Sequence, residues 1–178
     1  MTVRDIIIAP DPRLKVRSAP VTEIDDSLRG LTEDMLETMY AAPGIGLAAP
    51  QIGIHRRIVV IDAAKDEQAP REPLRLINPH VLWNSDERAV AEEGCLSVPG
   101  HYADVERPKA VRVKYLDIEG AGREIEAEGL LARCLLHEID HLDGILFLDH
   151  LSALKRNMIL RKMRKGRRDD RPGERRSA

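Results

Sequence analysis

Aromatic residues are scarce in this sequence: one Phe, one Trp and three Tyr make up 3% of its 178 residues. A core must therefore be built from aliphatic side chains, and the hydrophobic fraction of 43% is large enough to build one. The length fits one domain with a short appendage.

Cysteine is also rare, with Cys95 and Cys134 as the two examples. Two cysteines do not make a disulfide framework, and in a reducing compartment both are expected to stay thiols. No apolar run approaches the ~20 residues that a membrane-spanning helix needs. The stretch IIIAP near the start is too short for the core of a signal peptide. We therefore expect a cytoplasmic protein with no membrane partner.

The net charge is only -2, but the charges are unevenly distributed. Residues 155–178 contain eleven Lys or Arg and three Asp or Glu, so the rest of the chain is acidic. We expect a single catalytic domain over residues 1–165 that ends in a basic helix. Residues 166–178 have no apolar face and are expected to form a disordered basic tail. Such an end favours an anionic partner, although it is also typical of a solvated helix terminus.

Hydrophobic spacing predicts an α+β fold. Three stretches have the spacing of helices: residues 25–42, 130–142 and 152–165. Residues 56–62 and 74–79 have the short apolar runs of buried strands, separated by a polar loop over residues 63–73. Residues 110–129 alternate on both sides of two glycines, as a hairpin does. Because strands and helices do not alternate regularly, we expect a mostly antiparallel sheet around the central helix, with an amphipathic C-terminal helix.

The sequence HEIDH in the central helix predicts a metal site. His137 and His141 are four residues apart, so both imidazoles lie on one helix face and can meet at one point. In this HExxH arrangement the two histidines bind a metal and the glutamate, here Glu138, acts as general base. The apolar flanking residues favour a metal over two unliganded histidines, because unpaired buried charge is costly.

Two histidines do not complete a catalytic site, which takes three protein ligands and leaves one position for water. Downstream, His150, Asp149 and Glu174 are available, but none has the spacing of the extended metzincin motif. Upstream, Cys95 lies in EGCLS, a turn bounded by glycine and proline, and a thiolate with two imidazoles suits zinc or iron. Taken alone, Cys95 is typical of a small buried hydrophobe. Cys134 lies among leucines and is expected to be a core residue.

A third stretch, GIGLAAPQ at residues 44–51, has glycines that permit close approach of the backbone to a ligand. Gln51 carries an amide that could donate to a developing oxyanion. On its own this stretch indicates no more than a loop. In this order, however, GIGLAAPQ, EGCLS and HEIDH resemble the three signature motifs of the peptide deformylases, in their bacterial form. The resemblance covers residues 1–165 and implies removal of the formyl group from the formyl-methionine of newly made polypeptides.

The resemblance also implies a metal centre. Cys95, His137 and His141 would be the ligands, with water in the fourth position, and Glu138 would be the general acid and base for that water. A bound metal lowers the pKa of water from ~16 toward ~7, which supplies the nucleophile. The family typically works with Fe²⁺ and often carries Zn²⁺ after purification, and Cys with two His also suits Ni²⁺ or Co²⁺.

The substrate residues follow from the same resemblance. Gln51 and the backbone N–H of Leu96 would hold the formyl oxygen, and the backbone of Gly46, with its neighbours Gly44 and Ile45, would pair with the substrate. An apolar pocket for methionine is implied, and its aliphatic candidates are Ile45, Leu96 and Leu135.

Two further acidic residues, Asp140 and Glu93, lie within the motifs. Asp140 does not share the face of the histidines, and a role in fixing the helix is expected. Glu93 could pair with Arg107 across the turn, or it could be a solvated carboxylate.

Three other functions remain open. A zinc endopeptidase of the HExxH type would not need Cys95. A cysteine hydrolase would use Cys95 as nucleophile and His137 or His141 as base. A structural metal-binding module would need four protein ligands, and only three are convincing.

The basic C-terminal helix has its own predicted partner. Leu154, Met158, Ile159 and Met163 are expected to pack on the body and to leave the basic side chains free. The resemblance implies ribosome contact through this helix, because bacterial relatives use it so. The contact would be to phosphate, without sequence-specific recognition of nucleic acid.

Overall fold

The computed structural model describes residues 2–63 and 72–169. The helices are α1 (Asp26–Ala41), α2 (Gly129–Leu142) and α3 (Ala153–Asp169), with short 3-10 helices at Pro12–Lys15, Ala49–Ile52 and Phe147–His150. The strands are β1 (Gly46–Ala48), β2 (Ile58–Ile61), β3 (Leu74–Asn84), β4 (Arg88–Glu93), β5 (Ala103–Pro108), β6 (Ala110–Leu116) and β7 (Gly122–Glu128). None of the described helices is long and apolar enough to cross a membrane.

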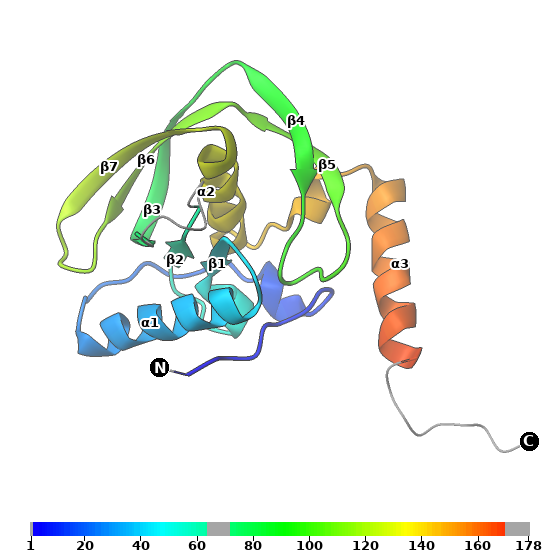
Figure 1. The fold of residues 1–178 in the computed structure, drawn as a ribbon, viewed down its shortest axis with the longest axis horizontal. Helices are drawn as coiled ribbons and strands as arrows, with labels where there is room; N and C mark the ends of the chain where they lie inside the picture. Colours follow the sequence, from blue (N-terminus) through cyan, green and yellow to red (C-terminus); the bar gives the residue numbers. More distant parts are fainter. Residues whose placement is uncertain (1, 64–71, 170–178) are drawn as a thin grey trace, which may run out of the picture.

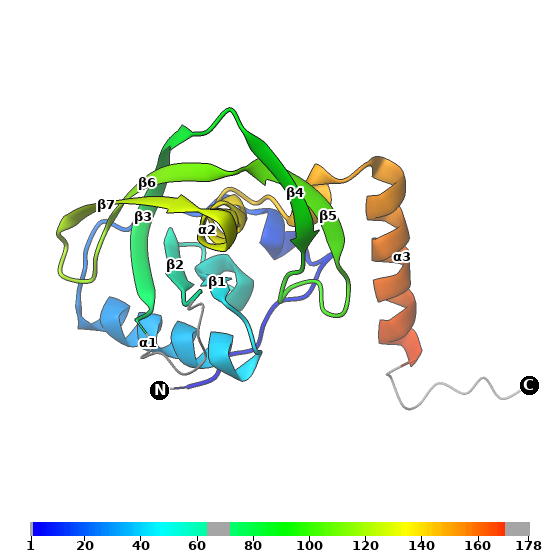
Figure 2. The same cartoon turned by 45° about the horizontal axis from the view of Figure 1, so that its top comes forward.

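The predicted α+β fold is confirmed. Strands β1, β2, β3, β6 and β7 form one antiparallel sheet in that order, and β4 and β5 form a separate two-stranded ribbon. The large sheet curls around α2, while α1 lies across its open side and α3 lies beside the ribbon (Figures 1 and 2). The central helix is therefore enclosed between the sheet and the ribbon.

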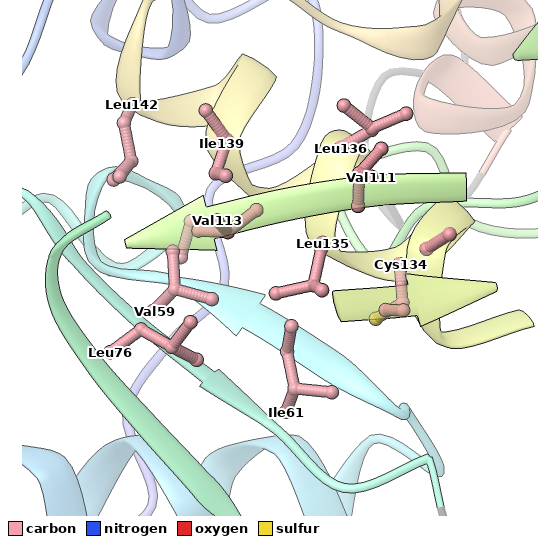
Figure 3. Close-up of a cluster of buried hydrophobic side chains, with 13 residues drawn as sticks. Val59, Ile61, Leu76, Val111, Val113, Cys134, Leu135, Leu136, Ile139 and Leu142 are labelled. Carbon is pink, nitrogen blue, oxygen red and sulfur yellow. The ribbon is translucent and has the colours of Figure 1, made fainter. Parts of the chain in front are cut away.

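Helix α2 has one face that belongs to the core (Figure 3). Leu135, Ile139 and Leu142 are buried there against the sheet. Their partners from the strands are Val59, Ile61, Leu76, Val111 and Val113. All of these side chains are aliphatic, as the composition requires, and each fully buried one contributes about 1.5–3 kcal/mol. This packing fixes the rotation of α2, and so decides which residues its opposite face presents.

The predicted elements agree with the structure over most of their length. The helix predicted at residues 25–42 is α1, whose start is capped by Asp25, with Oδ1 accepting from the Leu28 N–H at 2.8 Å. The predicted hairpin is β6–β7. Strand β3 continues past the predicted end at residue 79, because Asn78 adopts a positive φ of 52° and a register shift lets pairing with β6 resume. Most of the predicted polar loop lies outside the described residues.

Helix α3 differs from its prediction in two respects. It continues to Asp169, four residues past the predicted end, and residues 170–178 of the predicted tail lie outside the described part of the chain. Its packing face was predicted wrongly in part. Met163 is buried and Ile159 packs beside it, but Leu154 is 73% exposed and Met158 is 50% exposed. The packed pair, Ile159 and Met163, and the exposed pair, Leu154 and Met158, each have a spacing of four residues. Periodicity alone therefore did not show which pair would pack on the body.

Candidate active site and metal centre

Three side chains with metal-binding atoms converge between α2 and the ribbon. The ligand atoms of Cys95, His137 and His141 all lie within 4.8 Å of one another. The Cys95 Sγ is 3.2 Å from the His141 Nε2, and the two imidazole centroids are 5.0 Å apart at an angle of 73°. Neighbouring ligand atoms of a tetrahedral zinc-type site are about 3.3–3.8 Å apart. The cluster therefore fits one metal ion, held by two residues of α2 and one that follows β4.

Glu93 orients one of the histidines. Its Oε2 accepts from the His137 Nδ1 at 3.1 Å, so in the neutral imidazole the proton lies on Nδ1 and the Nε2 lone pair is available to a metal. Burial by itself would lower the pKa of His137, but the hydrogen bonds to Cys95 and Glu93 outweigh it and raise the pKa well above its usual value. The surroundings of this imidazole thus favour positive charge, which a metal cation would supply.

The predicted pair of Glu93 and Arg107 is confirmed. Arg107 donates to both carboxylate oxygens, from Nε at 2.9 Å and from Nη2 at 3.0 Å, and both side chains are buried. Burial alone would raise the pKa of Glu93, but His137 and Arg107 together lower it far below its usual value. The carboxylate is therefore ionised and fixed in place behind the metal-binding imidazole.

Asp140 braces α2, as expected. Its Oδ2 accepts from the Arg107 Nη1 at 2.6 Å and lies 2.7 Å from the His150 Nε2. Through Arg107 of β5, the helix turn that carries His141 is joined to the ribbon. His150 contacts Asp140 and does not belong to the three-residue metal-binding cluster.

Glu138 is buried beside the cluster, with 4% of its surface exposed. Burial raises its pKa to about 7, and its Oε2 has no hydrogen-bond partner among the described residues. A Cβ added to Gly46 would be 2.5 Å from the Glu138 Oε1 and 2.8 Å from the Cys134 Sγ. Glycine at this position in β1 thus leaves the space that the carboxylate occupies.

Gln51 lies in the 3-10 helix Ala49–Ile52 and its side chain is fixed from both ends. The Oε1 accepts from the Ala48 N–H at 2.8 Å, and the Nε2 donates to the Ser97 Oγ at 3.2 Å. The same Nε2 is 3.6 Å from the Cys95 Sγ. The amide N–H₂ group therefore points toward the metal-binding cluster, and the first and second motifs meet there.

A cavity of about 600 Å³ opens beside the cluster. Its walls come from all three motifs and include Ile45, Leu96, Cys95, His137 and Glu138. The prediction that Leu135 lines this cavity is wrong, because the side chain faces the sheet and is fully buried in the core.

Other lining residues were missed by sequence reasoning. Leu130 and Cys134 line the cavity from α2, and Tyr102 lines it from the ribbon side. Cys134 is a buried core residue as predicted, but its thiol also reaches the cavity wall. Leu130 and Cys134 precede Glu138 by eight and four residues, so their helical spacing from Glu138 is the sequence signal for them, once packing of α2 against the sheet has set its rotation.

Comparisons with known proteins agree with these observations. Residues 3–157 match the family model described as polypeptide deformylase. A peptide deformylase of Mesorhizobium japonicum is 55% identical over 174 residues, which cover 98% of both chains. That of Rhizobium meliloti is 56% identical over 165 residues, or 93% of this chain and 94% of the relative.

Two solved structures have the same fold. Peptide deformylase from Ehrlichia chaffeensis in complex with actinonin has a TM-score of 0.90 and 44% identity, covering 94% of this chain and 99% of that chain. Peptide deformylase from Legionella pneumophila has a TM-score of 0.88 and 47% identity, covering 96% of this chain and all of the other, at 100%.

Proposed function

The chain belongs to the polypeptide deformylase family, and from this premise we propose which of its residues perform the reaction. The reaction is the metal-dependent hydrolysis of the formamide bond at an N-terminal formyl-methionine. The observation that carries the assignment is the convergence of Cys95, His137 and His141 beside the buried carboxylate of Glu138, at the wall of a cavity. The reacting formyl group would enter through this cavity.

Cys95, His137 and His141 are the proposed ligands of one divalent metal ion. When bound, the ion supplies Lewis acidity, which lowers the pKa of water and polarises a carbonyl oxygen. Fe²⁺ is the proposed native ion, with Zn²⁺, Ni²⁺ or Co²⁺ as substitutes, because a thiolate with two imidazoles accommodates each of them. The thiolate ligand also requires a reducing compartment, which agrees with a cytoplasmic location.

Glu138 is the proposed general acid and base. Its carboxylate accepts a proton from the attacking water and delivers it to the leaving amine as the bond between the formyl carbon and nitrogen breaks. Formate and a free N-terminal amine are the products. A pKa of about 7 suits both transfers, because the group can bind and release a proton near neutral pH. Its unpartnered Oε2 leaves an oxygen available for this role.

The formyl oxygen is held by two proposed donors, the Gln51 Nε2 and the backbone N–H of Leu96. Gln51 needs no reorganisation, since its amide is already oriented by Ala48 and Ser97. One such donor is typically worth roughly 10²–10³ in rate. The backbone of Gly46 would pair with the main chain of the substrate, and Gly44 and Ile45 would form the adjoining wall.

The assay that tests this function is formate release from a formyl-Met peptide under anaerobic conditions, with the metal content measured on the same sample. We expect activity in proportion to bound metal, and loss of activity with a chelator. A cysteine hydrolase would ignore the chelator and be blocked by alkylation. An endopeptidase would cleave internal peptide bonds in an unformylated peptide. Either result, without formate release, would overturn the proposal.

Formyl-Met peptides should be preferred over formyl-Ala and formyl-Asp peptides of otherwise identical sequence. Ile45, Leu96 and Leu130 give the cavity an apolar wall, and burying a methionine side chain is worth about 1.5–3 kcal/mol. We expect a kcat/KM at least ~10-fold higher for formyl-Met than for formyl-Ala, with formyl-Asp lower still. Equal values for the three peptides would contradict a shaped apolar pocket.

Helix α3 is the proposed contact with the ribosome, where formylated N-termini emerge. Its exposed basic residues are Lys155, Arg161, Lys162, Arg164 and Lys165. The helix is anchored on the body through Ile159 and Met163, so these cations are presented by a fixed element. Each contact with a ribosomal phosphate releases roughly one counterion, so the binding affinity should fall steeply as the salt concentration rises.

Charge neutralisation tests this better than truncation, because removing α3 would also remove the buried Met163. A variant with Arg161, Lys162, Arg164 and Lys165 changed to Gln should co-sediment with ribosomes ~10-fold less at low salt. Its turnover of a small formyl-Met peptide should stay unchanged. The control variant replaces three exposed cations on β6 and β7, namely Arg112, Lys114 and Arg123, and should bind like the wild type. Equal co-sedimentation of both variants would rule out α3 as the docking element.

A further inference from the structure

Arg133 is a largely buried cation that the reaction described above does not use. It lies on α2 four residues before His137 and eight before His141, on the helix face that carries both histidines. Its side chain is only 12% exposed. Burying a guanidinium is costly unless its donors are satisfied, so its partners indicate what it does.

The partners all belong to the β4–β5 ribbon. The Nη1 donates to the Glu93 Oε1 at 2.7 Å and to the carbonyl oxygen of Val105 at 2.9 Å. The Nη2 donates to the carbonyl oxygen of Ala89 at 2.9 Å, and a longer contact of 3.4 Å joins Nη1 to the carbonyl oxygen of Ala91. One side chain thus binds the backbone of both strands and the ionised carboxylate of Glu93, the last residue of β4.

The ribbon needs such an anchor. It extends from the end of the β3–β6 pair, where the Ser85 N–H donates to the Ala110 carbonyl and the Lys109 N–H donates to the Glu87 carbonyl, both at 2.9 Å. Beyond this junction the described strands β4 and β5 pair with each other alone, and a two-stranded ribbon by itself is only marginally stable. Cys95 follows the ribbon two residues after Glu93, whereas His137 and His141 belong to α2. The distance between the thiol and the imidazoles therefore depends on how the ribbon is seated against the helix.

We propose that Arg133 is a positioning residue that anchors the β4–β5 ribbon to α2. It thereby fixes the position of Cys95 relative to His137 and His141. The inference rests on the proposed metal site. Arg107 joins the same two elements through Asp140, so the ribbon has a second anchor. Loss of Arg133 should therefore weaken metal retention while Cys95, His137 and His141 stay close to one another. Partners that orient metal ligands are typically worth 10–100-fold in metal affinity or activity.

Two variants separate the parts of this role. Arg133→Met keeps most of the aliphatic stem and removes every donor. Arg133→Lys keeps a charge for Glu93 but cannot bind the carboxylate and the carbonyl groups of both strands at once. Arg88→Met is the matched control, since Arg88 is a half-exposed cation of the same ribbon that contacts Glu106 at 3.5 Å.

The measurement is the release of Co²⁺ from loaded protein to excess chelator, followed by the charge-transfer band between thiolate and cobalt. We expect Arg133→Met to release Co²⁺ at least ~10-fold faster than the wild type, with a weakened band, and Arg133→Lys to be intermediate. Arg88→Met should stay within ~2-fold. A general loss of stability would not alter the band of the folded, loaded protein, so the band distinguishes positioning from folding.

Release at the wild-type rate with an unchanged band in Arg133→Met would overturn the inference. If that variant does not fold, Arg133→Lys decides, and release no faster than from Arg88→Met would also overturn it. Failure of the proposed function can be distinguished from failure of this inference, because it would be seen in the wild type. The wild type would then bind Co²⁺ through the thiolate without releasing formate, or would not bind Co²⁺ at all.

Discussion

Glu138→Gln is expected to retain its metal and its fold while losing about 10²–10⁴ in kcat, the usual contribution of a positioned general acid or base. The amide has the size of the carboxylate, so the space beside Gly46 still accommodates it. It cannot accept the proton of the attacking water. The loss corresponds to roughly 2.7–5.5 kcal/mol of barrier. Metal content, thermal unfolding and formate release should be measured on the same preparation.

Glu124→Gln is a suitable control, because this glutamate is exposed on β7 and does not line the cavity. Its turnover should equal that of the wild type. Near-normal formate release by metal-loaded Glu138→Gln would remove Glu138 from the proton transfers. That result would leave the proposed role of His137 and His141 as metal ligands unchanged.

Cys95→Ser is expected to have the other large effect, on metal retention. A hydroxyl is a poorer ligand than a thiolate for Fe²⁺, Zn²⁺ or Co²⁺. The affinity for metal should therefore fall by more than the roughly 10–100-fold that is typical when a residue hydrogen-bonded to a ligand is replaced. In the Co²⁺-loaded variant the charge-transfer band of the thiolate should disappear, while the remaining absorption should still indicate Co²⁺ bound by imidazoles.

Cys134→Ala serves as the comparison for metal binding, since its thiol donates weakly to the Ile45 carbonyl at 3.8 Å and lies outside the metal-binding cluster. It should keep both the metal and the thiolate band. A serine variant at residue 95 that held metal as tightly as the wild type would exclude Cys95 as a ligand.

The parts of the site that could be predicted are those encoded by local spacing. The positions of His137 and His141 one helical turn apart follow from residue numbers alone. Cys95 and Gln51 were placed by resemblance to three motifs, because no periodicity joins residues so distant in the sequence. The structure brings them together through the ribbon and the 3-10 helix Ala49–Ile52.

The ribbon itself could not be predicted from hydrophobic alternation. Most residues of β4 are exposed, so its sequence has no buried stripe to mark it as a strand. The partners of Arg133 also carry no sequence signal, since three of its four contacts are to backbone carbonyl groups. The choice between Leu135 and Cys134 as the cavity residue depended on the rotation of α2, which is set by packing against the sheet.

Because the same helix carries core side chains and the proposed metal ligands and general base, the protein has few ways to change one set without the other. The backbone amides of α2 should be among the last to exchange with deuterium, since opening this helix would require the whole domain to unfold. Variation of substrate preference is therefore expected to arise at cavity-wall residues that α2 does not supply, among them Pro43, Ile45, Leu96, Val98 and Tyr102. Random mutagenesis selected for new substrates should accumulate changes there, and leave the central helix almost untouched.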